Sequence, residues 1–255
     1  MTQIDFGLTA NDYAKHRAGF PDSLFDRLIA RGVANPGQTV VDLGTGAGTL
    51  ARGFARRGCR AIGIDPSEPL LAQAKLLSEA EGLTVEYRTG KAESTGLESR
   101  SVDVVTAGQS WHWFDGPTAA REIARILKPG GRVAICHFDW IPLKGNVVEA
   151  TEQLIVKHNP AWKWGGGHGL HPTCLRHLAE ADFVDLETFS YDVFVPYSHE
   201  DWRGRIRASA GVGASLPPEK VEAFDREHAT LLSEHFPEPI LQVHHRVWAA
   251  IGQKP

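Results

Sequence analysis

Cysteine is scarce in this sequence, and its placement excludes the sites that cysteines usually build. The three cysteines, Cys59, Cys136 and Cys174, include no closely spaced pair of the kind found in zinc sites and redox motifs. Cys59 and Cys136 stand in apolar, strand-like stretches. We therefore expect reduced, buried thiols in a cytoplasmic protein, with no disulfide framework.

An excess of basic charge is also missing. The chain has 27 Lys and Arg against 31 Asp and Glu, a formal net charge of -4, and its basic residues are scattered. Proteins that bind nucleic acid usually carry a basic patch for the phosphates. The charge balance argues against a nucleic-acid partner and favours a small-molecule substrate.

Long apolar runs are absent too. No uninterrupted apolar segment approaches the length needed to span a bilayer. The opening stretch MTQIDFGLTANDYAKHR has polar residues where a secretory signal needs an apolar core. We expect a cytoplasmic protein with no membrane partner, either a monomer or a homodimer.

The first half of the chain alternates two kinds of segment. Short runs rich in Val, Ile and Leu alternate with amphipathic helical stretches, which is the pattern of a parallel sheet covered by helices on both faces. The predicted strands are QTVVDLG, RAIGID, LTVEYRT, SVDVVTAG and GRVAICHF. The predicted helices include PSEPLLAQAKLLSEAEG, which ends at a glycine, and DGPTAAREIARILKPGG, which ends in a Pro-Gly-Gly stop.

The second half interrupts this regularity. Beyond residue 139 come a predicted helix, the aromatic and Gly-rich loop AWKWGGGHGLHP, and two strand-like segments that bracket two more helices. We predict an α/β fold: a doubly wound, mostly parallel, seven-stranded sheet with an inserted helical cap and an N-terminal helical segment. The chain should form one domain, with 1–35 as the N-terminal segment, 36–139 as the cofactor-binding core, and 140–255 as cap insertions and last strands.

The stretch VVDLGTGAGTL places three glycines directly after a strand. Gly44, Gly46 and Gly48 lead into the helix TLARGFARRG, so bare backbone N–H groups and a positive helix end would face a ligand at the carboxyl edge of the sheet. Asp65 ends the next strand about 20 residues later, where a carboxylate can accept hydrogen bonds from both ribose hydroxyls. These features predict a nucleoside-containing cofactor.

Two such cofactors compete. A dinucleotide fingerprint has the form G-x-G-x-x-G/A, and its last position is occupied here by Thr49, whose branched side chain opposes close packing of helix on strand. The spacing G-x-G-x-G preceded by Asp42 resembles the first motif of class I S-adenosylmethionine-dependent methyltransferases. Further pieces of that family's pattern follow in order: GIDPS, GKAEST, VDVVTAGQSWHWF and LKPGGRVAI. The resemblance covers residues 38–137, and an NAD-dependent oxidoreductase is the least favoured alternative.

The resemblance implies a role for each matching residue. The glycine turn would lie against the methionine and ribose parts of S-adenosylmethionine, Asp42 would hold the amino group, and Asp65 would bind the ribose. Residues after the third strand would cover the adenine. The implied cofactor-binding residues are Asp42, Gly44, Thr45, Gly46, Gly48, Asp65, Pro66, Ser67, Ala92, Glu93 and Gln109. S-adenosylhomocysteine would be the product.

The segment YAKHRAGFP extends the resemblance to a subgroup. It resembles the tyrosine and arginine element of the trans-aconitate methyltransferase-like proteins, in which this element closes over the cofactor and the arginine neutralises the methionine carboxylate. Tyr13 and Arg17 would project from one helix face and bind the cofactor together. The alternative is that Tyr13 packs on the core and Arg17 is solvated.

The acceptor side depends on fewer residues. Methyl transfer from a sulfonium needs alignment and exclusion of water, and a general base only where the acceptor must lose a proton. QSWHWFD follows the fourth strand and should line the acceptor pocket, so His112 is one candidate base; His137, at the end of the fifth strand, is the other. Both have a purely structural alternative. The predicted substrate-binding residues are Trp111, Trp113, Trp164, His168, Arg203 and Arg207.

Two of these assignments have specific alternatives. His168 and His171 have a spacing that could bind a metal, but no third ligand is evident, so we expect no metal site and a lid or packing role for both. Arg203 and Arg207 would share a helix face and could hold a substrate carboxylate. A solvated face with acidic neighbours is equally compatible with their sequence.

The predicted function is S-adenosylmethionine-dependent methyl transfer to a small-molecule acceptor. O-methylation of a carboxylate or hydroxyl by direct in-line displacement is the favoured reaction. N- or C-methylation of a metabolite, and a non-methylating protein that only binds the cofactor, are the alternatives.

Overall fold

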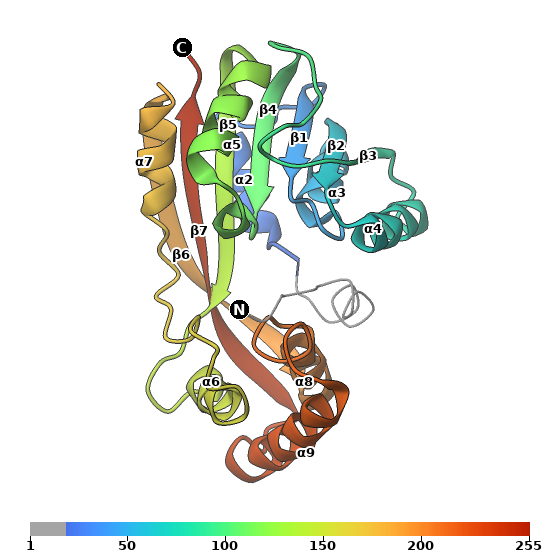
Figure 1. The fold of residues 1–255 in the computed structure, drawn as a ribbon, viewed down its shortest axis with the longest axis vertical. Helices are drawn as coiled ribbons and strands as arrows, with labels where there is room; N and C mark the ends of the chain where they lie inside the picture. Colours follow the sequence, from blue (N-terminus) through green and yellow to red (C-terminus); the bar gives the residue numbers. More distant parts are fainter. Residues whose placement is uncertain (1–18) are drawn as a thin grey trace. The chain divides into compact units, whose positions relative to one another are not determined.

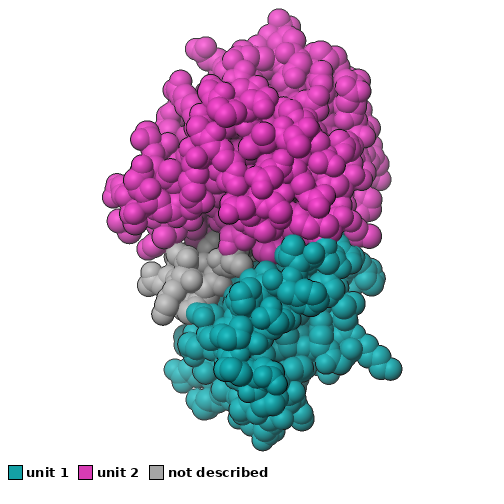
Figure 2. Space-filling model, turned by 180° about the vertical axis from the view of Figure 1, so that it is seen from behind, with its two compact units in different colours: residues 1–18, 139–169, 192–246 teal, residues 19–138, 170–191, 247–255 magenta. Residues whose placement is uncertain are grey.

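Contacts divide the chain into two compact units. The computed structural model describes residues 19–255. Its described residues fall into a core unit, Gly19–Phe138, Leu170–Tyr191 and Val247–Pro255, and an insert unit, Asp139–Gly169 and Asp192–Arg246. Figure 2 colours the core unit magenta and the insert unit teal. The predicted range 140–255 is shared between the two units, and the single-domain organisation stays a prediction.

Five parallel strands account for most of the sheet (Figure 1). They are β1 (Thr39–Leu43), β2 (Arg60–Asp65), β3 (Val85–Thr89), β4 (Val102–Gly108) and β5 (Leu127–Trp140). β1 pairs in parallel with β2 and β4, β2 with β3, and β4 with β5. Val41 lies between Ile62 and Val105 of the neighbouring strands. Buried β-branched residues of this kind are typical of parallel strands that are covered on both faces.

Two long strands complete a seven-stranded sheet. β6 spans Val184–Ser198 and β7 spans Ile240–Gln253, and the strand order is β3-β2-β1-β4-β5-β7-β6. The backbone N–H of Gly130 donates to the carbonyl of Lys254, and the N–H of Lys254 donates to the carbonyl of Gly131. This reciprocal pattern belongs to antiparallel neighbours. The predicted seven-stranded, mostly parallel sheet is confirmed.

The helices of the core unit bury one apolar face each. They are α2 (Asp22–Ile29), α3 (Thr49–Ala55), α4 (Glu68–Ala80), α5 (Gly116–Ile126) and α7 (Thr173–Glu180), with the short 3-10 helix η2 (Trp111–Trp113) after β4. In α5 the buried residues include Ala119, Ile123 and Ile126, spaced three and four apart. The predicted helix ends in a Pro-Gly-Gly stop, whereas α5 ends at Ile126 and the Pro-Gly-Gly residues belong to β5, which begins directly after it.

Apolar burial stabilises the core unit. Leu43, Ile64, Val105, Ile123 and Ile135 belong to one buried cluster that joins the sheet to its helices. Full burial of one such side chain stabilises the fold by about 1.5–3 kcal/mol relative to exposure. The three cysteines are free and buried, as the sequence predicts.

The insert unit has its own apolar centre. Helices α6 (Val147–His158), α8 (His199–Arg207) and α9 (Pro218–His235) pack there around the fully buried Trp202 and Phe224. α6 contacts α9, and α9 contacts α8. Within residues 19–255, no helix combines the length and the apolar character that a membrane span requires.

Candidate functional site

The glycine turn after β1 has the backbone that the sequence predicts. Gly44, Gly46 and Gly48 have φ angles of 63°, 54° and 78°, in the left-handed region that favours glycine. A Cβ on Gly44 would lie 2.6 Å from the Cβ of Ser110, and one on Gly48 would lie 2.3 Å from the hydroxyl oxygen of Tyr87. Two of the three glycines are therefore required by packing as well as by conformation.

Asp65 connects the end of β2 to this turn. One carboxylate oxygen accepts the N–H of Gly46 at 2.8 Å, and the other accepts the N–H of Ser67 at 2.8 Å. Burial raises the pKa of Asp65, while these two hydrogen bonds favour its charged form. Because each carboxylate oxygen can accept a second hydrogen bond, Asp65 can bind the turn and a pair of ribose hydroxyls at the same time.

Asp42 lies beneath the turn and is fully buried. Its two oxygens accept the hydroxyls of Thr45 at 2.6 Å and Thr106 at 2.9 Å. Burial raises the pKa of Asp42 to about 7 in spite of these bonds. Thr45 acts here by holding Asp42. Thr106, on β4, was missed by sequence analysis, because only the pairing of β1 with β4 brings it to Asp42.

The residues after β3 contribute mainly to local structure. Ala92 is buried, while Pro66, at the end of β2, is exposed. The carboxylate of Glu93 accepts the N–H of Asp115 at 2.8 Å, and Asp115 in turn caps α5 through the N–H of Thr118. Glu93 therefore holds the start of α5, whatever further part it takes in binding an adenine.

The loop after β4 is tied to the strands on both sides. The backbone N–H of Gln109 donates to the carbonyl of Cys136 at 2.9 Å, and its side-chain amide donates to the carbonyl of Phe138. Gln109 has a φ of 57°, which is uncommon for a residue other than glycine. The hydroxyl of Ser110 donates to the carbonyl of Leu43 at 2.9 Å. The loop is thus anchored beside the glycine turn.

Trp111 faces the protein interior. Its side chain is 6% exposed, and its indole N–H donates to Nδ1 of His177 on α7 at 3.3 Å. This burial argues against the predicted contact between Trp111 and an acceptor. His112 and Trp113, the next two residues, are exposed and remain candidates for the acceptor side.

His137 is buried in a cluster of rings. The imidazole of His171 stacks on it, with ring centroids 3.4 Å apart and planes 12° apart. His112 lies 5.9 Å from His137, and Trp248 lies 6.0 Å from it. The structure thus brings both candidate bases together and adds His171. His168, which the sequence grouped with His171, belongs to the insert unit.

The predicted arginines are already paired with carboxylates in the insert unit. Arg203 and Arg207 both donate to the carboxylate of Asp225, and Arg207 also donates to Glu200 at 2.9 Å. Their guanidinium groups lower the pKa of Asp225, although its burial opposes this. We therefore do not assign a substrate carboxylate to these two residues. Asp225 lies 18 residues beyond Arg207, so the sequence could not show the pairing.

A buried carboxylate holds the glycine-rich loop. Glu152 on α6 accepts the indole N–H of Trp140 at 2.8 Å and the backbone N–H of Gly166 at 2.7 Å. Burial raises the pKa of Glu152. Trp164 and His168, on the same loop, are exposed. Sequence analysis missed Glu152, because one glutamate in an amphipathic helix carries no signal of burial.

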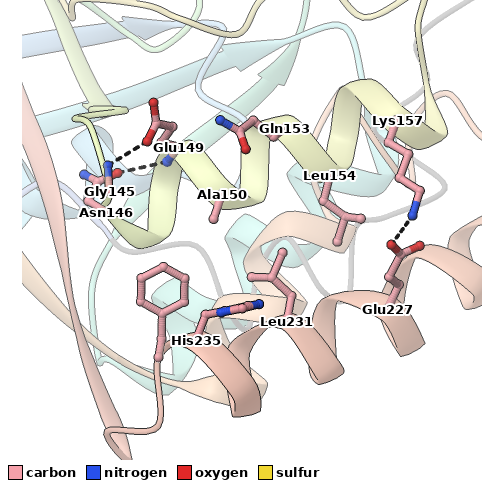
Figure 3. Close-up of a pocket in the computed structure, with 11 residues that line it drawn as sticks. Gly145, Asn146, Glu149, Ala150, Gln153, Leu154, Lys157, Glu227, Leu231 and His235 are labelled. Carbon is pink, nitrogen blue, oxygen red and sulfur yellow. Dashed lines mark hydrogen bonds and ion pairs between the residues drawn. The ribbon is translucent and has the colours of Figure 1, made fainter.

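A surface hollow of about 420 Å³ lies between α6 and α9. Figure 3 shows Lys157 of α6 reaching Glu227 of α9 near one end of it, with Leu154 and Leu231 pointing toward each other. None of the residues predicted to bind a cofactor or an acceptor lines this hollow.

Tyr13 and Arg17, the predicted clasp over the cofactor, lie outside the described residues. Their role stays a prediction.

Comparison with known proteins agrees with this geometry. Residues 41–135 match a family model described as a methyltransferase domain. An uncharacterised methyltransferase of Mycobacterium tuberculosis is 34% identical over 151 residues, which are 57% of this chain and 59% of the relative. The match therefore spans less than two thirds of that relative's length. The segment that matches the methyltransferase-domain model includes the glycine turn, Asp65 and the loop after β4.

Two further similarities carry named activities. A ubiquinone biosynthesis O-methyltransferase of Hahella chejuensis is 39% identical over 105 residues, 40% of this chain and 44% of the relative. The structure of Haemonchus contortus phosphoethanolamine N-methyltransferase 2, with phosphomonomethylethanolamine and S-adenosylhomocysteine, superposes with a TM-score of 0.58 at 20% identity. It covers 98% of this chain and 57% of that one, and at this identity it shows the shared fold alone.

Proposed function

We propose that this protein is an S-adenosylmethionine-dependent methyltransferase that methylates a small-molecule acceptor at oxygen. The observation that carries the proposal is the bond between Asp65 and the N–H of Gly46, which joins a buried carboxylate to a bare glycine turn. This is the arrangement that a ribose and an aminoacyl chain need at the carboxyl edge of a parallel sheet. The methyltransferase-domain match covers both residues.

The described residues fit the cofactor in shape and in chemistry. The glycine turn offers backbone without side chains, Asp65 offers acceptors for ribose hydroxyls, and Gln109 directly follows β4. When bound, the cofactor supplies an electrophilic methyl group on a sulfonium. The residues that would hold it are Asp42, Gly44, Thr45, Gly46, Gly48, Asp65, Pro66, Ser67, Ala92, Glu93 and Gln109, with Tyr13 and Arg17 as the proposed clasp.

The chain's own contribution to the reaction is positioning. The loop after β4 is fixed by bonds to β1 and β5, so the exposed His112 and Trp113 have defined positions. An in-line displacement disperses charge, and its rate depends chiefly on alignment and on exclusion of water. The exposed ring of Trp113, on this loop, could exclude water from a bound acceptor.

Oxygen is the proposed acceptor atom for two reasons. The similar ubiquinone biosynthesis protein is an O-methyltransferase, and the imidazoles near the end of β5 could take a proton from a hydroxyl. Nitrogen or carbon acceptors, and a protein that binds the cofactor without methylating, are the alternatives that the test below separates.

The proposal is tested by calorimetric titration with S-adenosylmethionine, S-adenosylhomocysteine and NAD in parallel. We expect micromolar binding of the first two and none of NAD. Incubation with S-[methyl-³H]adenosylmethionine and a panel of phenols, carboxylic acids and amines should then label an oxygen acceptor. Binding of NAD alone would overturn the proposal. Tight binding of S-adenosylmethionine without turnover on any acceptor would favour the non-methylating alternative.

A further inference from the structure

Three side chains of the kind that bind metal ions meet at the end of β5. His137 and Asp139 stand two positions apart on that strand, so they lie on the same face of it. His171 comes from the segment just before α7. One ligand atom from each of the three side chains lies within 4.8 Å of the other two. Sequence analysis found no third ligand for His171, because β5 lies far from it in the sequence.

The backbone around these three side chains is held by hydrogen bonds. The side-chain amide of Gln109 donates to the carbonyl of Phe138, the residue between the two members on β5. The backbone N–H of Gln109 donates to the carbonyl of Cys136 at 2.9 Å. Before α7, the thiol of Cys174 donates to the carbonyl of His171 at 3.1 Å. A metal site needs ligands whose positions are supported in this way.

The donor set indicates which ions would bind. Two imidazole nitrogens and one carboxylate oxygen suit divalent transition-metal ions such as Zn²⁺ and Fe²⁺. Mg²⁺ and Ca²⁺ prefer oxygen ligands throughout. With both imidazoles neutral, the carboxylate of Asp139 leaves one negative charge in the group, which a divalent cation would compensate. Donor atoms around one tetrahedral zinc ion lie about 3.4 Å apart, so a rotation of one side chain would complete the geometry.

The stacked rings show which side chain has to rotate. The planes of His137 and His171 are 12° apart, with centroids separated by 3.4 Å. The lone pair of an imidazole nitrogen lies in the plane of its ring, so two parallel rings cannot both be directed at one ion. His137 is 2% exposed and lies on a strand, with the indole of Trp248 6.0 Å from its ring. His171 is only partly buried and lies outside helices and strands, so its ring is the one that can turn.

We propose that His137, Asp139 and His171 form a binding site for a divalent transition-metal ion of the Zn²⁺ or Fe²⁺ type. When the ion binds, the ring of His171 turns out of its stack, and one nitrogen of each imidazole and one oxygen of Asp139 face the ion. Structural zinc sites have four protein ligands, whereas a site with three keeps a position open for water or a small molecule. This site is of the second kind. The proposal goes beyond methyl transfer and does not depend on it.

The ion also changes which imidazole could take part in a proton transfer. A ring nitrogen that binds an ion has no lone pair left for a proton. The ring of the exposed His112 lies 5.9 Å from that of His137. With the ion bound, His112 is therefore the remaining candidate base for the proposed methyl transfer.

The test is a titration of the full-length protein with metal ions after dialysis against a chelator. Calorimetry with Zn²⁺ should show one site per chain with a dissociation constant of about 1 μM or lower. Mg²⁺ at about 1 mM should not compete with Zn²⁺ for this site. Co²⁺ should give the strong visible absorption of an ion with few ligands, and Zn²⁺ should remove it. No binding of Zn²⁺, or equal binding of Mg²⁺, would overturn the proposal.

Two ligand variants separate this site from the other histidines of the chain, which has 12 in all. Asp139→Asn keeps the shape of the side chain but removes its charge, and His171→Phe keeps a ring that can stack on His137 but removes its nitrogens. Both positions are only partly buried, so both variants should fold. Each should weaken Zn²⁺ binding by at least about tenfold and remove the visible absorption of bound Co²⁺.

Matched controls change the same kinds of residue elsewhere. His235→Gln alters an exposed histidine of α9, and Glu98→Gln alters an exposed carboxylate, so both should bind Zn²⁺ as wild type does. Urea unfolding without metal checks the fold of every variant. Zn²⁺ binding that is unchanged in both Asp139→Asn and His171→Phe would overturn the ligand set. Binding that falls as much in the controls would show adventitious coordination by surface residues and would also overturn it.

The open position is tested with azide, a small anion that binds to metal ions. Azide should change the visible spectrum of the Co²⁺-loaded wild-type protein, because three protein ligands leave room for it. An unchanged spectrum would show that the chain supplies a fourth ligand, and it would overturn the three-ligand assignment.

Discussion

At the scale of single residues, the carboxylates of the site differ in what they bind. Asp65 accepts two backbone N–H groups and keeps acceptor capacity for a ligand, while Asp42 receives two hydroxyls and is buried. The raised pKa of Asp42, about 7, leaves a share of it protonated at neutral pH. Of the two, Asp65 is therefore the residue that we propose faces a ligand, while Asp42 holds Thr45 and Thr106.

Asp65→Ala should weaken S-adenosylmethionine binding by roughly 1 to 3 kcal/mol, because hydrogen bonds to a charged group are lost. Calorimetry measures the change. Glu98→Ala, which removes an exposed carboxylate of the same unit, is the matched control and should leave affinity unchanged. Equal affinity in wild type and Asp65→Ala would show that the cofactor does not lie against this carboxylate.

Gly44→Ala should destabilise the fold by about 1–3 kcal/mol more than Gly82→Ala, because only the first adds an overpacked methyl group. Both glycines have a left-handed φ, 63° and 67°. A Cβ on Gly82 meets nothing within 4 Å, whereas one on Gly44 meets Ser110. Urea unfolding measures both variants. Equal losses would mean that backbone conformation alone requires Gly44.

At the scale of elements, α7 connects distant parts of the core unit. Its residue His177 accepts the indole N–H of Trp111, and His171 lies two residues before its first residue, Thr173. A Cβ on Gly116 would lie 2.1 Å from Nδ1 of His177, so α5 and α7 also pack closely. Sequence analysis did not predict α7. The side chains that contact α7 and the segment before it come from β5 and η2, which lie far away in the sequence.

His177→Ala should destabilise the protein by about 1–3 kcal/mol, because it leaves the buried indole N–H of Trp111 without its bond. Urea unfolding measures the loss, and the tryptophan emission of the folded protein should change with it. Arg176→Ala alters an exposed neighbour on α7 and should change stability by less than about 0.5 kcal/mol. A similar small effect for His177→Ala would show that the bond contributes little.

At the scale of the whole molecule, buried ionisable groups have opposite effects on how the stability of the fold changes with pH. Burial lowers the pKa of His228 and His245 to about 4, and it raises that of Asp42 to about 7. As pH falls from about 6.5 to 4, the unfolded chain takes up protons on the two histidines and the folded chain does not, so their contribution to stability is lost. Over about pH 4 to 7, Asp42 opposes this, because its folded form binds a proton more tightly. In the wild-type protein, the pH dependence of the free energy of unfolding is therefore the difference between these two opposing effects.

His228→Leu should remove one of these contributions. Between about pH 7.5 and about pH 5, its free energy of unfolding should fall by about 2 kcal/mol less than that of wild type, since one buried histidine no longer resists protonation. Urea unfolding at the two pH values measures the difference. His235→Gln, on the exposed side of α9, is the control and should follow wild type. If the free energy of unfolding of His228→Leu fell as much as that of wild type, groups other than His228 would cause the acid sensitivity.

The sequence by itself determined the sheet, the glycine turn and the acid at the end of β2. These follow from local rules: apolar runs of strand length, left-handed glycines after a strand, and a fixed distance to the next strand end. The residues that carry these signals lie close together in the sequence, so their spacing is enough to identify them.

Only the tertiary structure decided which side chains meet. It buried Trp111 against His177, stacked His171 on His137, and bound the arginines of α8 to Asp225. Each of these contacts joins segments that are far apart in the sequence, and composition carries no signal for such pairs. The pKa of Asp42 depends on the balance between its burial and its hydrogen bonds, and the exposure of His171 depends on the residues packed around it. Both exist only once the chain has folded.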